Sequence, residues 1–133
     1  KAAALGIDGS HALFLLPEGD TASRQGAIDV SALRVVDRGA LRLLAAQPQV
    51  SIKISGLGIT DRAWTPDSIR PIVVECIEAF GTERAMFASD FPVERVHGTF
   101  DAFYSAFDAI TADFSAEERD RLFAANAEAI YRI

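Results

Sequence analysis

The chain has 133 residues, of which half are hydrophobic and 24% are charged, and its formal net charge is −6. This balance is typical of one globular domain with a hydrophobic core and not of a disordered chain. The acidic surplus disfavours a nucleic-acid partner, because no basic stripe is present to contact phosphates. No apolar run approaches the roughly 18 residues that a membrane span needs, and the first residues lack the architecture of a signal peptide. A single cysteine excludes an internal disulfide, so we expect a cytoplasmic protein.

The first 32 residues carry the weakest pattern in the chain. An apolar run at residues 12–16 (ALFLL) predicts a buried strand that is closed by Pro17. The polar stretch 19–26 is typical of a loop. Ser31 can cap a helix, and apolar residues at helical spacing extend this predicted helix to Ala46.

The middle of the chain predicts two strands with a helix between them. Residues 50–55 (VSIKIS) alternate between apolar and polar side chains, as a strand with one apolar face does. Thr65 can cap a helix that ends at Phe80, before a glycine in the C′ position. Pro71 lies inside this pattern, so either the first turn is kinked or the helix proper begins at Pro71. Residues 85–89 predict the second strand. The apolar stripe of the helix consists of Ile69, Ile72, Val73, Cys76, Ile77 and Phe80.

The remainder of the chain is predicted to be helical. A helix begins at about Thr99, and its aromatic residues are expected in the core. Residues 115–118 (SAEE) match a capping box and open another helix, and residues 126–133 predict one more short helix. The expected core residues of the first of these helices are Phe100, Phe103, Phe107 and Ile110.

Alternating helices and strands predict an α/β fold with parallel βα units. In parallel sheets, ligands and catalytic groups gather at the carboxyl ends of the strands. Ser55 and Asp90 both stand at such ends. For Asp90 two interpretations remain: a catalytic carboxylate, with Pro92 fixing the turn, or a carboxylate that only caps this turn.

Several blocks of the sequence carry a resemblance to a known family. Their order and spacing, from about Arg38 to the end of the chain, resemble the C-terminal part of the amidohydrolase-related TIM-barrel hydrolases, in particular the lactonase-like branch. The SDxP element and the terminal Asn-Ala…Tyr-Arg are the most specific parts. The blocks are VSIKISGLG (50–58), Trp64, FGTERAMFASDFPVE (80–94) and NAEAIYRI (126–133).

The resemblance implies that residues 33–133 are βα units from the C-terminal part of a (β/α)8 TIM barrel, and that residues 1–32 are an atypical start. Strand 50–55 would be the seventh, and the strand that ends at Asp90 the eighth. The family implies that Asp90 is the general base on the attacking water and, where a divalent metal such as zinc or manganese is bound, one of its ligands. A whole barrel takes about 250 residues, and the family's first-strand His-x-His pair does not occur here. Residues 1–32 should contain the sixth strand, with His11 as a remnant of its histidine.

Further side chains are candidates for substrate binding. Lys53 lies on the polar face of its strand, where it could neutralise an anionic substrate, pair with the carboxylate at the strand end, or form a structural salt bridge. Trp64 either lines a substrate loop or packs against the start of the following helix. For His11 the alternative is a partly buried histidine bonded to the backbone. The candidate substrate-binding residues are His11, Lys53, Ser55, Trp64 and His97.

We therefore expect hydrolysis of a lactone, or of a related ester or amide of a small molecule, by water that Asp90 activates. Two alternatives stay open: a non-catalytic barrel fragment, and a decarboxylase or hydratase on the same scaffold. A barrel cut open exposes strand edges and an apolar interior. We therefore expect a homo-oligomer, or association with the missing half of the barrel.

Overall fold

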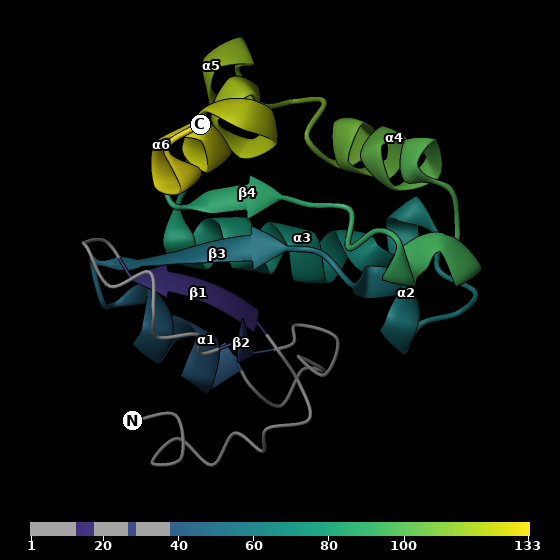
Figure 1. Ribbon diagram of the computed structural model, residues 1–133, viewed down its shortest axis with the longest axis horizontal. Coiled ribbons are helices and arrows are strands. Elements are labelled where there is room, and N and C mark those ends of the chain that lie inside the picture. The colour runs from purple at the N-terminus through teal and green to yellow at the C-terminus, as the bar shows by residue number, and fades with distance from the viewer. Residues whose placement is uncertain (1–12, 18–26, 29–37) are drawn as a thin grey trace.

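A computed structural model describes residues 13–17, 27–28 and 38–133 (Figure 1). The strands are β1 (Leu13–Pro17), β2 (Ala27–Ile28), β3 (Val50–Ile54) and β4 (Ala85–Phe87). The helices are α1 (Arg38–Ala45), α2 (Leu57–Thr60), α3 (Pro66–Phe80), α4 (Phe100–Ile110), α5 (Ala116–Asp120) and α6 (Asn126–Tyr131), with a 3-10 turn η4 (Val93–Val96) and a π turn η5 (Arg121–Ala125). Within these described ranges, no helix is both long enough and apolar enough to cross a membrane.

The four strands form one mixed sheet in the order β2-β1-β3-β4. β3 and β4 are parallel, with Ile52 opposite Ala85 and Ile54 opposite Phe87, which confirms the parallel pair expected from the sequence. β1 is antiparallel to both β2 and β3. A sixth barrel strand would run parallel to the seventh, so β1 does not have the direction of the sixth strand that the resemblance implies for residues 1–32. The physical reason is that a short apolar run indicates a strand but carries no information on its direction.

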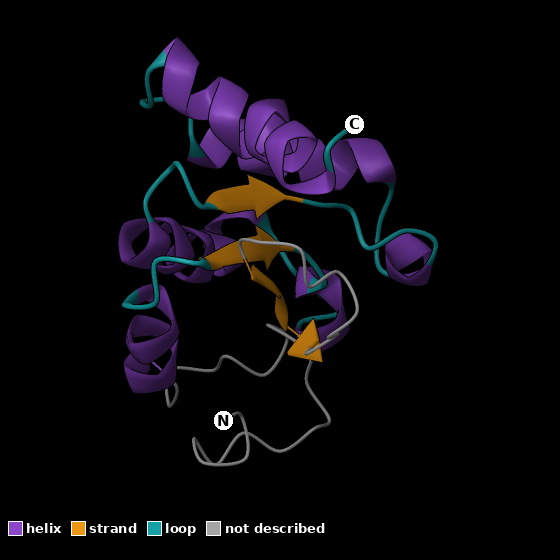
Figure 2. Ribbon diagram, turned by 60° about the vertical axis from the view of Figure 1, so that its left-hand side comes forward, coloured by secondary structure: helices purple, strands orange, loops and turns teal. Residues whose placement is uncertain are grey.

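The helix α3 covers one face of the sheet together with α1 (Figure 2). Ile52 and Ile54 of β3 have no solvent exposure and belong to the same core as the buried stripe of α3. Thr65 caps α3 through a capping box with Ser68, and Gly81 ends it with φ 75°. The helix begins at Pro66 and continues through Pro71, so the alternative of a helix that begins at Pro71 was wrong. The predicted helix and its apolar face are therefore confirmed, because both capping signals and the periodicity agree.

The end of β4 is enclosed by aromatic rings from two other elements. Phe87 stacks on Phe107 of α4 with a centroid distance of 4.3 Å and meets the edge of Phe123 of η5 at 4.9 Å. Phe103 and Phe107 are buried as expected, but Phe100 is 47% exposed. Phe100 opens α4, and its ring stacks on Tyr104 and meets Phe91 edge-on instead of entering the core. These contacts fix the strand whose end carries Asp90.

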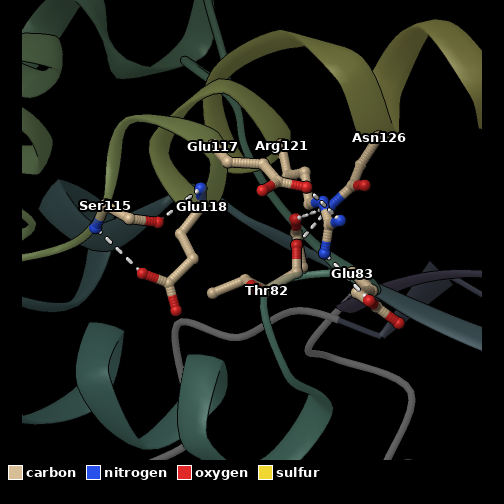
Figure 3. A network of polar contacts seen from close by, with 8 residues as sticks. Thr82, Glu83, Ser115, Glu117, Glu118, Arg121 and Asn126 are labelled. Carbon is tan, nitrogen blue, oxygen red and sulfur yellow. Dashed lines mark hydrogen bonds and ion pairs between the residues drawn. The ribbon is translucent and has the colours of Figure 1, made fainter.

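Polar contacts connect the last helical segment (α5, η5 and α6) to the turn before β4 (Figure 3). Ser115 and Glu118 form the expected capping box. Arg121 bridges Glu83 and Glu117 at 2.9 and 2.7 Å. The buried Asn126 donates from Nδ2 to the carbonyl oxygens of Thr82 and Ala85, both at 2.7 Å. The C-terminal segment therefore holds both ends of the turn that leads into β4.

Candidate active site at the carboxyl ends of β3 and β4

Asp90 follows the end of β4 in a backbone conformation that is rare for an L-amino acid. The ladder to β3 continues to Ala88, whose N–H donates to the oxygen of Ile54 at 3.0 Å. Asp90 then adopts φ 54°, in the left-handed region. The peptide bond between Phe91 and Pro92 is cis. A non-glycine residue in this region costs about 1–3 kcal/mol, and such residues cluster at functional sites. The observed conformation therefore supports a functional role for this position.

The turn after β4 has a local cap that does not come from Asp90. The hydroxyl of Ser89 accepts a hydrogen bond from the N–H of Phe91 at 3.3 Å. The backbone oxygen of Asp90 accepts from the N–H of Glu94 at 3.1 Å, which leads the chain into η4. Ser89 therefore caps the Phe91 N–H, and the half-buried Asp90 follows the end of the strand.

Lys53 lies within electrostatic range of Asp90. It projects from β3 on the side opposite to the buried Ile52 and Ile54, and it is half-buried. Burial lowers the pKa of Lys53 because it disfavours the charged ammonium, and the negative charge of Asp90 acts in the opposite direction. Ser55 follows directly after β3 and is also half-buried. Because β3 and β4 are parallel, their carboxyl ends lie at the same end of the sheet. Lys53, Ser55 and Asp90 are all located towards this end.

Trp64 and His97 are brought together at the loop that follows Asp90. The indole Nε1 of Trp64 donates to the backbone oxygen of His97 at 3.0 Å. The Trp64 ring stacks on Phe103 at a centroid distance of 4.2 Å. A Cβ atom at Gly98 would lie 3.0 Å from the Phe103 ring and 3.3 Å from the Trp64 ring, so the loop passes close to both. Trp64 therefore contacts this loop through both a hydrogen bond and ring packing.

Glu94 is a site residue that the sequence did not indicate. It has no solvent exposure, and its Oε1 accepts a hydrogen bond from the N–H of Gly58 at 2.9 Å. Burial raises the pKa of Glu94, the Gly58 N–H and His97 lower it, and the charge of Asp90 raises it. Glu94 lies in a four-residue 3-10 turn, which is too short to show a periodic burial pattern. No signal in the local sequence separates it from an exposed glutamate.

The described residues do not make a metal site by themselves. No group of three or more His, Cys, Asp or Glu side chains that could hold a metal ion is found in the described part of the chain. A zinc site takes at least three protein ligands, so Asp90 does not supply one without ligands from elsewhere. His11 lies outside the described residues, and its expected role is not addressed by the structure.

This edge of the sheet therefore combines a carboxylate with a strained backbone, a partly desolvated ammonium and a hydroxyl. A carboxylate can accept a proton from water, and a nearby ammonium can stabilise negative charge.

Comparisons with known proteins agree with the resemblance seen in the sequence. Residues 38–133 match the family model described as amidohydrolase, which confirms a match beginning at Arg38. The uncharacterized protein y4mH of Sinorhizobium fredii (strain NBRC 101917 / NGR234) is 51% identical over 96 residues, which are 72% of this chain and 32% of that protein. The L-fucono-1,5-lactonase of Burkholderia multivorans (strain ATCC 17616 / 249) is 34% identical over 104 residues, covering 72% of this chain and 35% of the enzyme.

Two solved structures of an amidohydrolase from Burkholderia multivorans are similar in fold. One, with bound zinc, superimposes with a TM-score of 0.71 at 29% identity and covers 98% of this chain and 47% of its own. The other, with bound HEPES, gives a TM-score of 0.67 at 34% identity and covers 72% of this chain and 36% of its own. The chain thus spans about a third of the length of the curated relatives it matches.

Proposed function

The chain belongs to the amidohydrolase family, and on this premise we propose that it hydrolyses a lactone, or a related ester or amide of a small molecule, with Asp90 as the general base. The observation that carries the proposal is the left-handed backbone of Asp90 at the carboxyl end of β4, beside Lys53. Two relatives named L-fucono-1,5-lactonase, at 34% and 36% identity, favour a lactone of a sugar acid as substrate.

In the proposed reaction, an Asp90 carboxylate oxygen accepts a proton from water while the water oxygen forms a bond to the lactone carbonyl carbon. The ring C–O bond then breaks, and the leaving oxygen takes the proton, so that one water and one lactone give one hydroxy acid. Lys53 stabilises negative charge that develops on the carbonyl oxygen. Ser55, Trp64 and His97 complete the proposed substrate-binding set.

A divalent metal, zinc or manganese, with Asp90 as a ligand is part of the proposal, because one solved relative contains bound zinc. The described residues do not complete such a site. No step of the proposed reaction therefore depends on it.

The first prediction concerns Asp90→Asn. We expect the chain to hydrolyse L-fucono-1,5-lactone faster than the spontaneous reaction, and the variant to lose about 10²- to 10⁴-fold in kcat, because the amide cannot accept the proton. The measurement is acid release followed with a pH indicator. The control is Asp101→Asn, an exposed aspartate on α4, which should retain the activity.

A non-catalytic role is the second candidate, because the chain spans only about a third of its curated relatives. Equal rates for the chain, for Asp90→Asn and for the uncatalysed reaction, across several lactones, would support this second candidate and overturn the first.

A further inference from the structure

A buried carboxyl lies four residues after Asp90 and has one oxygen without a partner. Glu94 is fully enclosed; its Oε1 is bonded to the Gly58 N–H, and its Oε2 is buried without a hydrogen-bond partner in the described part of the chain. A buried polar atom without a partner costs about 1–3 kcal/mol. An apolar side chain of similar size would avoid this cost, so the presence of a carboxyl here is not explained by packing.

The contact between Glu94 and Gly58 is unusually close. A Cβ atom at residue 58 would lie 2.5 Å from Oε2 of Glu94 and 2.7 Å from Cβ of His97. Any larger residue would therefore push the loop after β4 away from the loop after β3. The close contact therefore leaves no room for a side chain at residue 58 unless Glu94 and His97 move.

These contacts connect Asp90 to the neighbouring strand. Gly58 is in α2, just after β3, whereas Glu94 is in η4, just after β4. The backbone N–H of Glu94 donates to the oxygen of Asp90, and its side chain accepts from Gly58. The bond from Trp64 to His97 joins the same two regions of the chain a second time.

We propose that Glu94 is a positioning residue: by binding the Gly58 N–H it holds the turn that carries Asp90 at a fixed place beside β3. This inference rests on the proposed function of Asp90 for its catalytic consequence, but the positioning itself is measurable without catalysis.

The kinetic test compares Glu94→Gln with Glu94→Met. Glutamine keeps an acceptor for Gly58, whereas methionine has a similar size without that acceptor. We expect Glu94→Met to lower kcat about 10- to 100-fold with KM within about 3-fold, because a displaced base slows the chemical step. Glu94→Gln should stay within about 3-fold of the parent in both constants. Glu78→Met on α3, an exposed position, is the matched control.

A merely structural role gives a different result. If Glu94→Met lowers the melting temperature but leaves kcat of the folded protein unchanged, the positioning role is overturned. The same holds if Glu94→Gln and Glu94→Met lose kcat equally.

Amide hydrogen exchange tests the positioning separately from activity. In Glu94→Met, exchange at Gly58 and across residues 90–97 should become faster, and in Glu94→Gln it should resemble that of the parent. Unchanged exchange in residues 90–97 of Glu94→Met would overturn the inference, even in a protein without activity. If the parent chain does not hydrolyse lactones, the proposed function is overturned, but the positioning role of Glu94 is not.

Discussion

Cys76 shows how the fold controls the chemistry of a single side chain. It lies on the buried face of α3 and has no solvent exposure. Burial, with a smaller contribution from the charge of Glu75, raises the pKa of the thiol to about 12. The thiolate is the reactive form, so the folded protein presents an inert cysteine.

The prediction is that a thiol reagent at pH 8 does not modify Cys76 in the native protein, but modifies it readily in denaturant. A pH of 8 is about four units below the pKa of the native thiol, which is therefore protonated. An unfolded cysteine, with a pKa near 8.5, is partly ionised at this pH. The measurement is the rate of colour release from a disulfide reagent. Equal rates in native and denaturing buffer would contradict the burial of this residue.

At the same scale, the sequence drew attention to Asp90 as a candidate but not to the burial of Glu94, and the reason is physical. Asp90 ends an apolar run that is followed by proline, and this pattern is visible in the chain itself. Glu94 becomes buried only because α2 and the loop after β4 meet in space. Contacts of this kind depend on residues 36 positions apart, which local periodicity does not reach.

Helices and strands, too, were predicted where the local sequence pattern is strong and missed where it is weak. The helix over 65–80 was predictable because its cap, stripe and terminal glycine all agree. The short elements α2, η4 and η5 were not, since four or five residues carry too little pattern. Burial of Phe100 was over-predicted, because helical spacing does not show where a neighbouring element stops covering the helix.

Among the elements, the π turn η5 has a definite structural consequence. α5, η5 and α6 follow one another without a break, and the residues at both junctions keep helical dihedral angles. A π turn inserts one extra residue in a helix. This shifts the residues after it around the axis, and Asn126 is the first of them.

The prediction at this scale is that Asn126→Ala destabilises the protein by about 1–3 kcal/mol, because the buried carbonyl oxygen of Ala85 and the partly buried carbonyl oxygen of Thr82 lose their donor. Chemical denaturation of the parent and the variant measures the difference. Glu128→Ala, at an exposed position of the same helix, should stay within about 0.5 kcal/mol of the parent. Similar losses in both variants would show that the two hydrogen bonds are not the cause.

At the scale of the whole molecule, the described surface retains apolar side chains near the proposed site. Val93, Val96 and Phe100 follow Asp90 along the chain and are 58%, 80% and 47% exposed. Among the described strands, β4 pairs with β3 alone and is the outer strand of the sheet. Exposed apolar side chains and strand edges both favour association.

We therefore expect the chain to associate with itself, and Val96→Asp to weaken this association by replacing an apolar contact with a charge in an already acidic protein. Sedimentation at several concentrations measures the effect. Leu43→Asp on α1, at 59% exposure, is the control and should leave the association unchanged. A monomer at every concentration would contradict the expectation.

The antiparallel pairing of β1 restricts how the sheet can grow. β3 already has a hydrogen-bonded neighbour on each side, β1 and β4. A strand donated by another polypeptide would therefore have to join at an outer edge, beside β4 or beside β2, or displace β1 first. A strand that joined at β4 would lie next to the strand that ends at Asp90. The same association would therefore extend the sheet and add residues beside the candidate active site.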